Sequence, residues 1–284
     1  MRRIFRALSI AALTTVFALP AFADILDNIK ASGVLKVGFR EDARPFAFVG
    51  QDGKPAGYSV ELCDRIAAQL AEELGLPGVT VDYVPIKASE RIEMLMSGKI
   101  DIECGSSTQT LARREKVDFS LLTFITGAEM LTRTDSGISN METVAGHKVG
   151  VLGGTTTERG LIAGLEQRGT TAEVVSVSTH EEGIALLESG EIDAYFGDRA
   201  LLILLAMDSA NPASLKLSGH FYSYEPYALM MPKGEDGLRL VADRTLAALY
   251  RSGEIGEVYR RWFGNSKPSD LLKALYITQG LPVE

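Results

Sequence analysis

The chain has 284 residues, 46% of them hydrophobic, which is enough for two modest domains with their own cores. Its 37 acidic residues outnumber its 29 lysines and arginines, giving a formal net charge of −8 at pH 7. So acidic a protein should be soluble and is a poor partner for nucleic acid, and its two cysteines and three histidines lack the spacing of a metal site.

The first 23 residues have the pattern of a secretory signal peptide. Three arginines within the first six residues precede an apolar run over 7–19, and Ala-Phe-Ala at 21–23 forms a cleavage site. A membrane anchor is the weaker alternative, because the run is shorter than the roughly 20 residues that a membrane span needs. We expect the mature chain to begin at Asp24, to lie in the periplasm and not to insert into the membrane.

Strands and helices alternate through the first half of the expected mature chain. Leucine and isoleucine recur at four-residue spacing from Leu62 to Leu74, as on the apolar face of a helix, and Gly33 and Gly75 stand where helices are expected to end. In chain order we expect a helix, a strand, a helix, a strand and a helix over residues 26–32, 34–39, 62–74, 79–84 and 89–96.

One supersecondary pattern occurs twice, over residues 94–106 and 186–198. Each copy reads as the end of a helix, a Gly C-cap, a charged turn residue and a short buried strand that stops at Gly plus one polar residue. Two copies predict two similar α/β lobes. Because ligands lie beyond the carboxyl ends of strands in open α/β sheets, Ser106 and Asp198 are the first candidates for a shared binding cleft.

The second half repeats the order of the first, so each lobe is predicted to be βαβαβ. Two extended runs, 128–133 and 221–231, are expected to connect the lobes, which would then close like a hinge. The further expected elements are strands over 147–151 and 173–177, a helix ending near Gly169 and a helix over 180–189. The predicted organisation is a signal peptide, a first part of lobe 1, lobe 2, and a return to lobe 1 with C-terminal helices, over 1–23, 24–129, 130–223 and 224–284.

Two polar segments are candidates for binding an anion. Hydroxyl residues at 106–108 are followed within two helical turns by Arg113, which would supply donors and a cation to one carboxylate. A solvated helix face is the alternative, and it fits Arg114 better than Arg113. The Gly-Gly-Thr-Thr-Thr-Glu turn at 153–158 would direct backbone N–H groups at an anion, although an ordinary Thr N-cap has the same sequence.

The two cysteines, Cys63 and Cys104, have two interpretations. In an exported chain an even pair most simply indicates one disulfide, because the compartment is oxidising. Two buried free thiols, each acting as a small hydrophobic residue, are the alternative.

Taken together, several motifs resemble those of one family, the periplasmic solute-binding proteins of polar amino acid ABC importers (family 3), most closely the glutamate/aspartate-binding proteins. The likeness covers essentially the whole mature chain and implies a type II periplasmic binding protein fold, with a helix-flanked central sheet in each lobe and two hinge strands. The motifs are Val37-Gly38-Phe39-Arg40-Glu41, Pro45-Phe46, Gly57-Tyr58-Ser59, Glu90-Arg91-Ile92, Glu103-Cys104-Gly105-Ser106-Ser107-Thr108, Gly154-Thr155-Thr156-Thr157-Glu158, Leu187-Glu188-Ser189-Gly190 and Gly197-Asp198.

The resemblance implies a role for each end of a bound amino acid. The α-carboxylate would be held by Arg113 together with the hydroxyls of Thr108 and Thr156. The α-ammonium would be held by Asp198 with help from the position of Ser106. These last two residues are the strand-end pair that the internal repeat also indicates.

The resemblance also implies that Arg40, Arg91 and His180 contact the distal carboxylate of the ligand. From the residues alone, an arginine at position 91 on a helix surface would usually be solvated, and His180 could be an ordinary residue of a helix N-terminus. The chain departs from close relatives at Ala88, where they have a serine, with Ser89 next to it. One lost hydrogen bond is worth about 1 kcal/mol, which puts the preference between glutamate and aspartate in doubt more than the preference for an acidic ligand.

We therefore expect a binding protein, not an enzyme, that captures glutamate or aspartate between its lobes and delivers it to an inner-membrane ABC permease. No cofactor or metal is expected, and a monomer is the default state. The alternatives are a periplasmic enzyme resembling the cyclohexadienyl (prephenate/arogenate) dehydratases, a binding protein for a neutral polar amino acid, and a receptor whose partner is a sensor.

Overall fold

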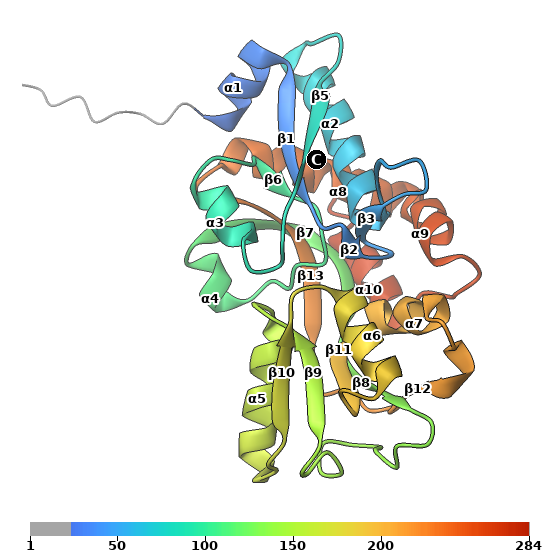
Figure 1. Ribbon diagram of the computed structural model, residues 1–284. Coiled ribbons are helices and arrows are strands. Elements are labelled where there is room, and N and C mark those ends of the chain that lie inside the picture. Colours follow the sequence, from blue (N-terminus) through green and yellow to red (C-terminus); the bar gives the residue numbers. More distant parts are fainter. Residues whose placement is uncertain (1–23, 284) are drawn as a thin grey trace, which may run out of the picture.

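The chain folds into two lobes, each built on a five-stranded sheet (Figure 1). The computed structural model describes residues 24–283, so the predicted signal peptide lies outside the described residues. The predicted two-lobe α/β architecture is confirmed. In sheet order the first lobe has β5 (Thr80–Pro85), β1 (Val34–Phe39), β6 (Ile102–Glu103), β13 (Glu225–Pro232) and β7 (Val117–Thr126), and the second has β10 (Glu173–Val177), β9 (Lys148–Leu152), β11 (Ala194–Asp198), β8 (Ala128–Arg133) and β12 (Leu215–Leu217).

Helices flank both sheets (Figure 1). The first lobe carries α1 (Ile25–Ser32), α2 (Tyr58–Leu74), α3 (Arg91–Met96), α4 (Leu111–Arg114), α8 (Asp236–Ser252), α9 (Ile255–Phe263) and α10 (Asp270–Gln279). The second lobe carries α5 (Thr156–Arg168), α6 (His180–Ser189), α7 (Arg199–Asp208) and the 3₁₀ turn η1 (Pro212–Ser214). A small sheet of β2 (Asp42–Ala43), β3 (Ala47–Val49) and β4 (Pro55–Ala56) completes the first lobe.

The repeated sequence pattern makes the same contacts in both lobes. The side chains of Asp101 and Asp193 accept the backbone N–H of Lys36 at 2.8 Å and of Lys148 at 2.9 Å, respectively. The N–H of each aspartate donates in turn to the carbonyl of the same lysine, at 2.8 Å. These paired bonds begin the parallel pairing of β6 with β1 and of β11 with β9. The repeat therefore encodes the central strand pair of each sheet.

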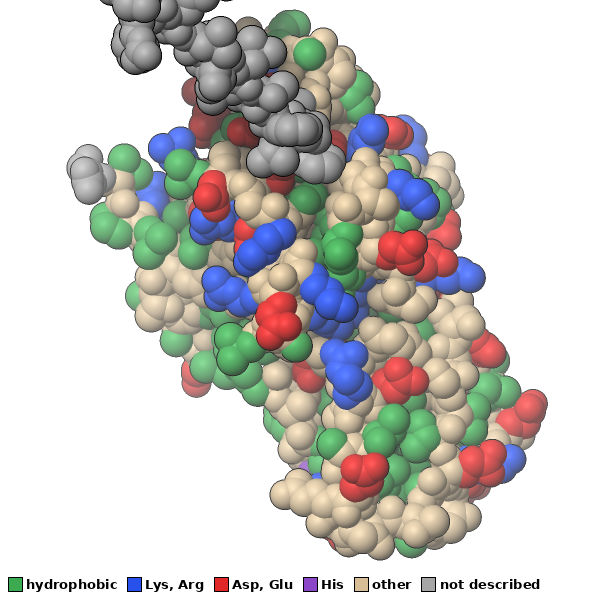
Figure 2. All heavy atoms as spheres, turned by 90° about the vertical axis from the view of Figure 1, so that its left-hand side faces the viewer, with side chains coloured by type: hydrophobic (Ala, Val, Ile, Leu, Met, Phe, Trp, Pro, Cys, Tyr) green, Lys and Arg blue, Asp and Glu red, His purple; other side chains and the backbone are tan. Residues whose placement is uncertain are grey.

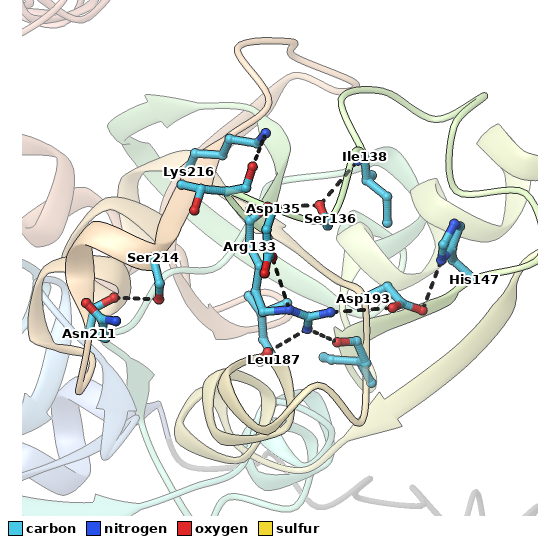
Figure 3. A network of polar contacts seen from close by, with 12 residues as sticks. Arg133, Asp135, Ser136, Ile138, His147, Leu187, Asp193, Asn211, Ser214 and Lys216 are labelled. Atoms are coloured by element: carbon cyan, nitrogen blue, oxygen red, sulfur yellow. Dashed lines mark hydrogen bonds and ion pairs between the residues drawn. The ribbon is translucent and has the colours of Figure 1, made fainter.

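Arg133, the last residue of β8, connects three elements of the second lobe (Figure 3). Its Nη1 donates to the carbonyls of Leu187 and Ile192, both at 2.9 Å, and its Nη2 lies 3.6 Å from Asp193 Oδ1. The other oxygen of Asp193 lies 3.2 Å from Nδ1 of His147. Because the last carbonyls of a helix have no partner within it, Arg133 stabilises the end of α6 and the turn into β11.

The lobes are joined where β7 continues into β8 and where the chain returns into β13. Only Gly127 separates β7 from β8, and a Cβ there would lie 2.4 Å from the carbonyl oxygen of Ser223. Residues 117–126, for which the sequence pattern predicted no element, form a strand of the first sheet. Residues 128–133, predicted as an extended run that connects the lobes, form a strand of the second sheet. The first run lacks a regular alternation, and its partner β13 lies far along the chain.

A cluster of aromatic rings fills part of the first-lobe core. The ring of Phe46 lies edge-on to those of Tyr58, Phe124, Tyr227 and Phe263, with centroids 4.9 to 6.1 Å apart. Edge-to-face contacts of this kind add stability beyond the burial of apolar area. Phe263 is partly buried and packs against the core of the first lobe.

The surface of the described residues combines both signs of charge. On the face shown in Figure 2, acidic and basic side chains are interspersed among hydrophobic and neutral ones. Among residues 24–283, no helix combines the length and the apolar character needed to cross a membrane. Acidic and basic residues are therefore mixed on this face, as they are in the composition of the whole chain.

The two cysteines form a disulfide, the first of the two interpretations drawn from the sequence. Cys63 lies on α2, Cys104 follows β6, and both side chains are fully buried in the core of the first lobe. The bridge joins positions 41 residues apart. It therefore ties the helix over the sheet to the strand that ends beneath the cleft.

Removing this bridge should lower the stability of the first lobe. The double variant Cys63→Ala/Cys104→Ala is expected to lose about 4 kcal/mol of unfolding free energy, because a closed loop of this length restricts the unfolded chain. Urea unfolding of the variant, compared with the wild type with and without reductant, measures the change. Equal midpoints for all three samples would contradict the prediction.

Candidate functional site

A small cavity lies between the two lobes. Both lobes contribute to its walls, and the lining residues come mostly from strand ends and helix N-termini, where backbone and side-chain polar groups converge. The lining residues are Arg40, Arg91, Ser106, Thr108, Leu152, Thr155, Thr156, Thr157, His180, Asp198 and Leu201.

Three buried arginines of the first lobe gather at this cavity. Arg40 follows β1 and is 2% exposed, Arg91 begins α3 and is 3% exposed, and Arg113 lies on α4 and is 5% exposed. Arg91 donates from Nη1 to Ser107 Oγ at 2.9 Å, and Arg113 donates from Nη1 to the carbonyl of Thr108 at 2.7 Å. Buried guanidinium groups at this density require anions, because each has lost its hydration.

Glu103 is a buried acid whose carboxylate interacts with the charges of these arginines. It ends β6 and is fully buried. Burial raises the pKa of Glu103, and the charges of Arg91, Arg40 and Arg113 oppose that rise without cancelling it. Conversely, burial lowers the pKa of Arg91 to about 9; the charges of Arg113 and Arg40 add to the effect, and Glu103 opposes it. Asp42 also pairs with Arg40, so three arginines face two acids and the cluster keeps positive charge that these acids do not neutralise.

Asp198, at the end of β11, presents one free carboxylate oxygen. Its Oδ2 accepts the hydroxyl proton of Tyr227 from β13. Its Oδ1 is buried and has no hydrogen-bond partner among the described residues. Burial raises the pKa of Asp198 to about 7 and the charge of Glu225 adds to the rise, whereas the Tyr227 hydrogen bond and the charges of Arg91 and Arg113 lower it. A cationic ligand group at Oδ1 would complete the hydrogen bonding of this carboxylate.

Hydroxyl groups from the two lobes meet at a second carboxylate. Thr108 follows β6, Thr156 begins α5, and both donate to Glu225 Oε2, at 2.5 and 2.8 Å. The two threonine oxygens lie 3.2 Å apart. Glu225 Oε1 accepts from Ser223 Oγ at 2.6 Å, and the glutamate is 3% exposed.

Asp42 forms a second link across the cleft. One oxygen pairs with Arg40 Nη2 at 2.5 Å, and the other accepts the backbone N–H of His180 at the N-terminus of α6, at 3.0 Å. Burial raises the pKa of Asp42, but the charge of Arg40 and the backbone hydrogen bond from His180 outweigh it, so the pKa is lowered. A helix N-terminus favours an anion, which adds to this stabilisation.

The imidazole of His180 is neutral in this position. Its Nδ1 lies 2.9 Å from the hydroxyl of Tyr195 on β11. Burial lowers the pKa of His180 to about 4 and the charge of Arg40 adds to the effect, whereas Asp42 opposes it. In the tautomer that accepts the phenol proton on Nδ1, the Nε2–H is a donor directed away from Tyr195.

Apolar and backbone contacts also join the lobes near the cleft. Ala88 of the first lobe packs into a cluster of second-lobe residues that includes Leu152 and Val177. Gly154 has a φ of +73°, and a Cβ there would lie 2.9 Å from the Cα of Ser89. Glycine at 154 thus permits both the turn and the close approach of the two lobes.

Seven of the eight residues proposed from the sequence line the cavity, and Arg113 does not. Arg113 instead supports the wall through the carbonyl of Thr108. The seven are Arg40, Arg91, Ser106, Thr108, Thr156, His180 and Asp198. Arg114 is exposed, as the alternative of a solvated helix face predicted.

Sequence reasoning missed the supporting groups Asp42, Glu103, Tyr195, Glu225 and Tyr227. Glu103 belongs to one of the motifs that carry the family resemblance. Glu225 and Tyr227 alternate within residues 221–231, for which the sequence predicted only a connection between the lobes. A buried acid in a strand is itself an unusual feature that needs a partner, and this signal could have indicated both glutamates.

Comparison with known proteins extends the likeness to most of the chain. The model of the bacterial extracellular solute-binding proteins, family 3, matches residues 35–265. The L-glutamate/L-aspartate-binding protein of Pseudomonas aeruginosa is 32% identical over 266 residues, which cover 92% of this chain and 88% of that protein. The glutamate/aspartate import solute-binding protein of Salmonella typhimurium is also 32% identical, over 90% of this chain and 88% of its own.

Solved structures with the same architecture differ in their ligands. An ancestral arginine-binding protein bound to arginine has a TM-score of 0.71 and 31% identity, covering 82% of this chain and 99% of its own. The ancestral amino acid-binding protein AncCDT-1, a precursor of cyclohexadienyl dehydratase, has a TM-score of 0.74 and 27% identity, covering 85% of this chain and 100% of its own. The fold is thus shared by proteins of different specificity.

The buried His180 should make the folded protein sensitive to acid. Its pKa of about 4 lies below the ordinary value near 6.5, so between these pH values the unfolded chain takes up a proton that the folded protein refuses. Stability is fully present above pH 6.5 and is lost as the pH falls towards 4. Between pH 7 and 4.5, His180→Gln should lose about 2 kcal/mol less unfolding free energy than the wild type.

Urea unfolding at the two pH values measures this difference. His220→Gln, at an exposed position, is the matched control and should behave as the wild type does. Equal acid sensitivity of His180→Gln and the wild type would show that the imidazole does not titrate in this way.

Proposed function

Because the chain belongs to family 3 of the bacterial extracellular solute-binding proteins, we propose that it is the receptor of an ABC importer that captures an acidic L-amino acid, glutamate or aspartate, between its lobes. The proposed location is the periplasm, and the proposed partner is an inner-membrane permease that accepts the closed complex. The protein acts by binding and release, without a catalytic step.

The observation that carries the proposal is the excess of buried positive charge on one wall of the cavity. Arg40 and Arg91 line the cavity, and Arg113 lies behind it. The acids beside these three arginines are Glu103 and Asp42, and Asp42 pairs with Arg40. A second carboxylate on the ligand would pair with these cations through charge-assisted hydrogen bonds. A neutral side chain would leave a guanidinium group unpaired, which costs several kcal/mol.

The other wall suits the α-ammonium group that every amino acid carries. Asp198 Oδ1 is a buried acceptor without a partner among the described residues, and it belongs to the lobe opposite the arginines. Ligand contacts to both lobes are complete only when the cleft is closed, so binding shifts the protein towards the closed state.

The enzymatic alternative has less support. A dehydratase needs an acid or base poised over the substrate, and Asp198 and His180 are the candidates in the cavity. Asp198 is better explained as the partner of the ligand ammonium group, and the lowered pKa of His180 makes it a poor proton donor near neutral pH. Incubation with prephenate should therefore yield no phenylpyruvate.

Calorimetric titration of protein stripped of ligand by unfolding and refolding tests the specificity. L-Glutamate or L-aspartate should bind with a Kd of micromolar or tighter, about −8 kcal/mol, and L-glutamine should bind at least 100-fold more weakly. Arg91→Met should remove most of that difference, because it deletes one of the cations that would be left unpaired.

Arg114→Met is the matched control, since Arg114 is the exposed neighbour of Arg113. It should leave both affinities unchanged. Heat with L-arginine or L-glutamine, and none with either acidic amino acid, would refute the proposed ligand.

Binding should release a proton near neutral pH. Asp198, with a pKa of about 7, must be ionised to hold an ammonium group, so the affinity is greatest above pH 7 and falls as the pH decreases through it. Titration at pH 7 in buffers of different ionisation enthalpy measures the released proton. Asp198→Asn should bind at least 100-fold more weakly and release none; an equal proton count for the two proteins would contradict this role.

A further inference from the structure

Glu225 occupies the point where both lobes and the returning strand meet. It is the first residue of β13, which pairs with β7 in the first sheet, and it directly follows the connection from the second lobe. Its side chain is almost completely buried. A carboxylate in this setting is costly unless it is fully hydrogen-bonded.

The hydrogen bonds of Glu225 join the lobes to each other. Thr108 of the first lobe and Thr156 of the second lobe both donate to Oε2, and Ser223 of the connection donates to Oε1. Hydrogen bonds to an ionised acceptor are about twice as strong as neutral ones. When the lobes separate, Glu225 must exchange at least one of these donors for water.

The same bonds restrict what the two threonines offer to a ligand. A hydroxyl group has one proton and two lone pairs. Thr108 donates its proton to Glu225, and Thr156 donates its proton to Glu225 or to Thr108, so the two oxygens present acceptors, and not donors, to a ligand. A ligand carboxylate could gain these protons only by competing with Glu225.

We propose that Glu225 is an interlobe clasp, a positioning residue that draws Thr108 and Thr156 together across the cleft and orients both hydroxyls during ligand capture. The proposal rests on the amino-acid-binding function proposed above and deepens it. Thr156 acts through Glu225, so both the closure of the cleft and the affinity for the ligand depend on the carboxylate of Glu225.

Glu225 also influences the protonation of Asp198, and with it the charge that Asp198 presents to the ligand. Four groups bear on that carboxylate: Glu225 and Tyr227 from β13, Arg91 from α3 and Arg113 from α4. The negative charge of Glu225 raises the pKa of Asp198, and the three others lower it. Replacing Glu225 by a neutral residue of the same shape should therefore move the pH dependence of binding to lower pH.

A double-mutant cycle on the affinity tests the clasp. The wild type, Glu225→Ala, Thr156→Val and the double variant are titrated by calorimetry with whichever amino acid the wild type binds best from a panel of acidic, neutral and basic ones. We expect each single variant to bind at least 10-fold more weakly than the wild type. The double variant should bind no more than about 3-fold more weakly than Glu225→Ala, because both substitutions remove the same Thr156–Glu225 interaction. Affinity losses that multiply would show that Thr156 acts independently of Glu225 and would overturn the clasp.

Glu225→Gln separates the clasp from a merely structural role. It keeps an acceptor oxygen and the size of the side chain, so its urea midpoint should stay near that of the wild type while the midpoint of the affinity against pH moves down by at least half a unit. Glu173→Gln, which removes an exposed glutamate from the start of β10, is the control and should leave both values unchanged. An unshifted pH midpoint in Glu225→Gln would contradict the charge-setting role.

The two proposals fail in different ways. If the wild type binds no acidic amino acid, the proposed ligand is refuted. The double-mutant cycle then still tests the clasp, with the amino acid that does bind. If the wild type binds glutamate and the affinity losses of the two single variants multiply in the double variant, the clasp is refuted and the proposed ligand stands.

Discussion

The structure depends on charged groups that are buried where the carboxyl ends of the strands of two sheets face each other. In water these groups would keep their hydration, and between the lobes they keep their charge only through specific partners. Arg40 with Asp42, Thr108 with Glu225, and Asp198 with Tyr227 are such pairs. The last pair joins the two lobes directly, and Asp42 and Glu225 each accept a further hydrogen bond from the second lobe. These pairs therefore hold the lobes together, and one member of each pair, Arg40, Thr108 or Asp198, lines the cavity.

Much of this arrangement could be predicted from the sequence, because the duplicated pattern has a local cause. Glycine at the helix end, aspartate after the turn and a short apolar strand recur in both halves, and in both the aspartate fastens its strand to the first strand of the sheet. That contact fixes the central strand pair of each sheet. The position of Ser106 and Asp198 at corresponding strand ends followed from the pattern without knowledge of the fold.

The parts that could not be predicted involve partners that are distant in the sequence. Glu225 and Tyr227 meet Thr108, Thr156 and Asp198 only after the chain has crossed between the lobes for the second time. Neither periodicity nor motif spacing contains that information. Strand β7 was missed for a related reason, since its pattern is irregular and its pairing with β13 depends on the complete fold. Arg113 was expected to supply a cation to a ligand carboxylate; it is buried, but its place behind the cavity wall depends on the backbone carbonyl of Thr108.

Selectivity in such a cleft depends on few side chains, because the backbone architecture is shared with proteins of other specificity. In the proposed binding mode Asp198 contacts the ammonium group that every α-amino acid carries, so it cannot distinguish one amino acid from another. We propose that the distinction rests on Arg40, Arg91 and His180, whose side chains are already desolvated. A ligand that brings a second carboxylate compensates charge that the protein has buried in advance, whereas a neutral ligand must leave that charge uncompensated. Discrimination by charge is therefore stronger than discrimination by length, and the apolar surroundings of Ala88 give no hydroxyl by which glutamate and aspartate could be told apart at that position.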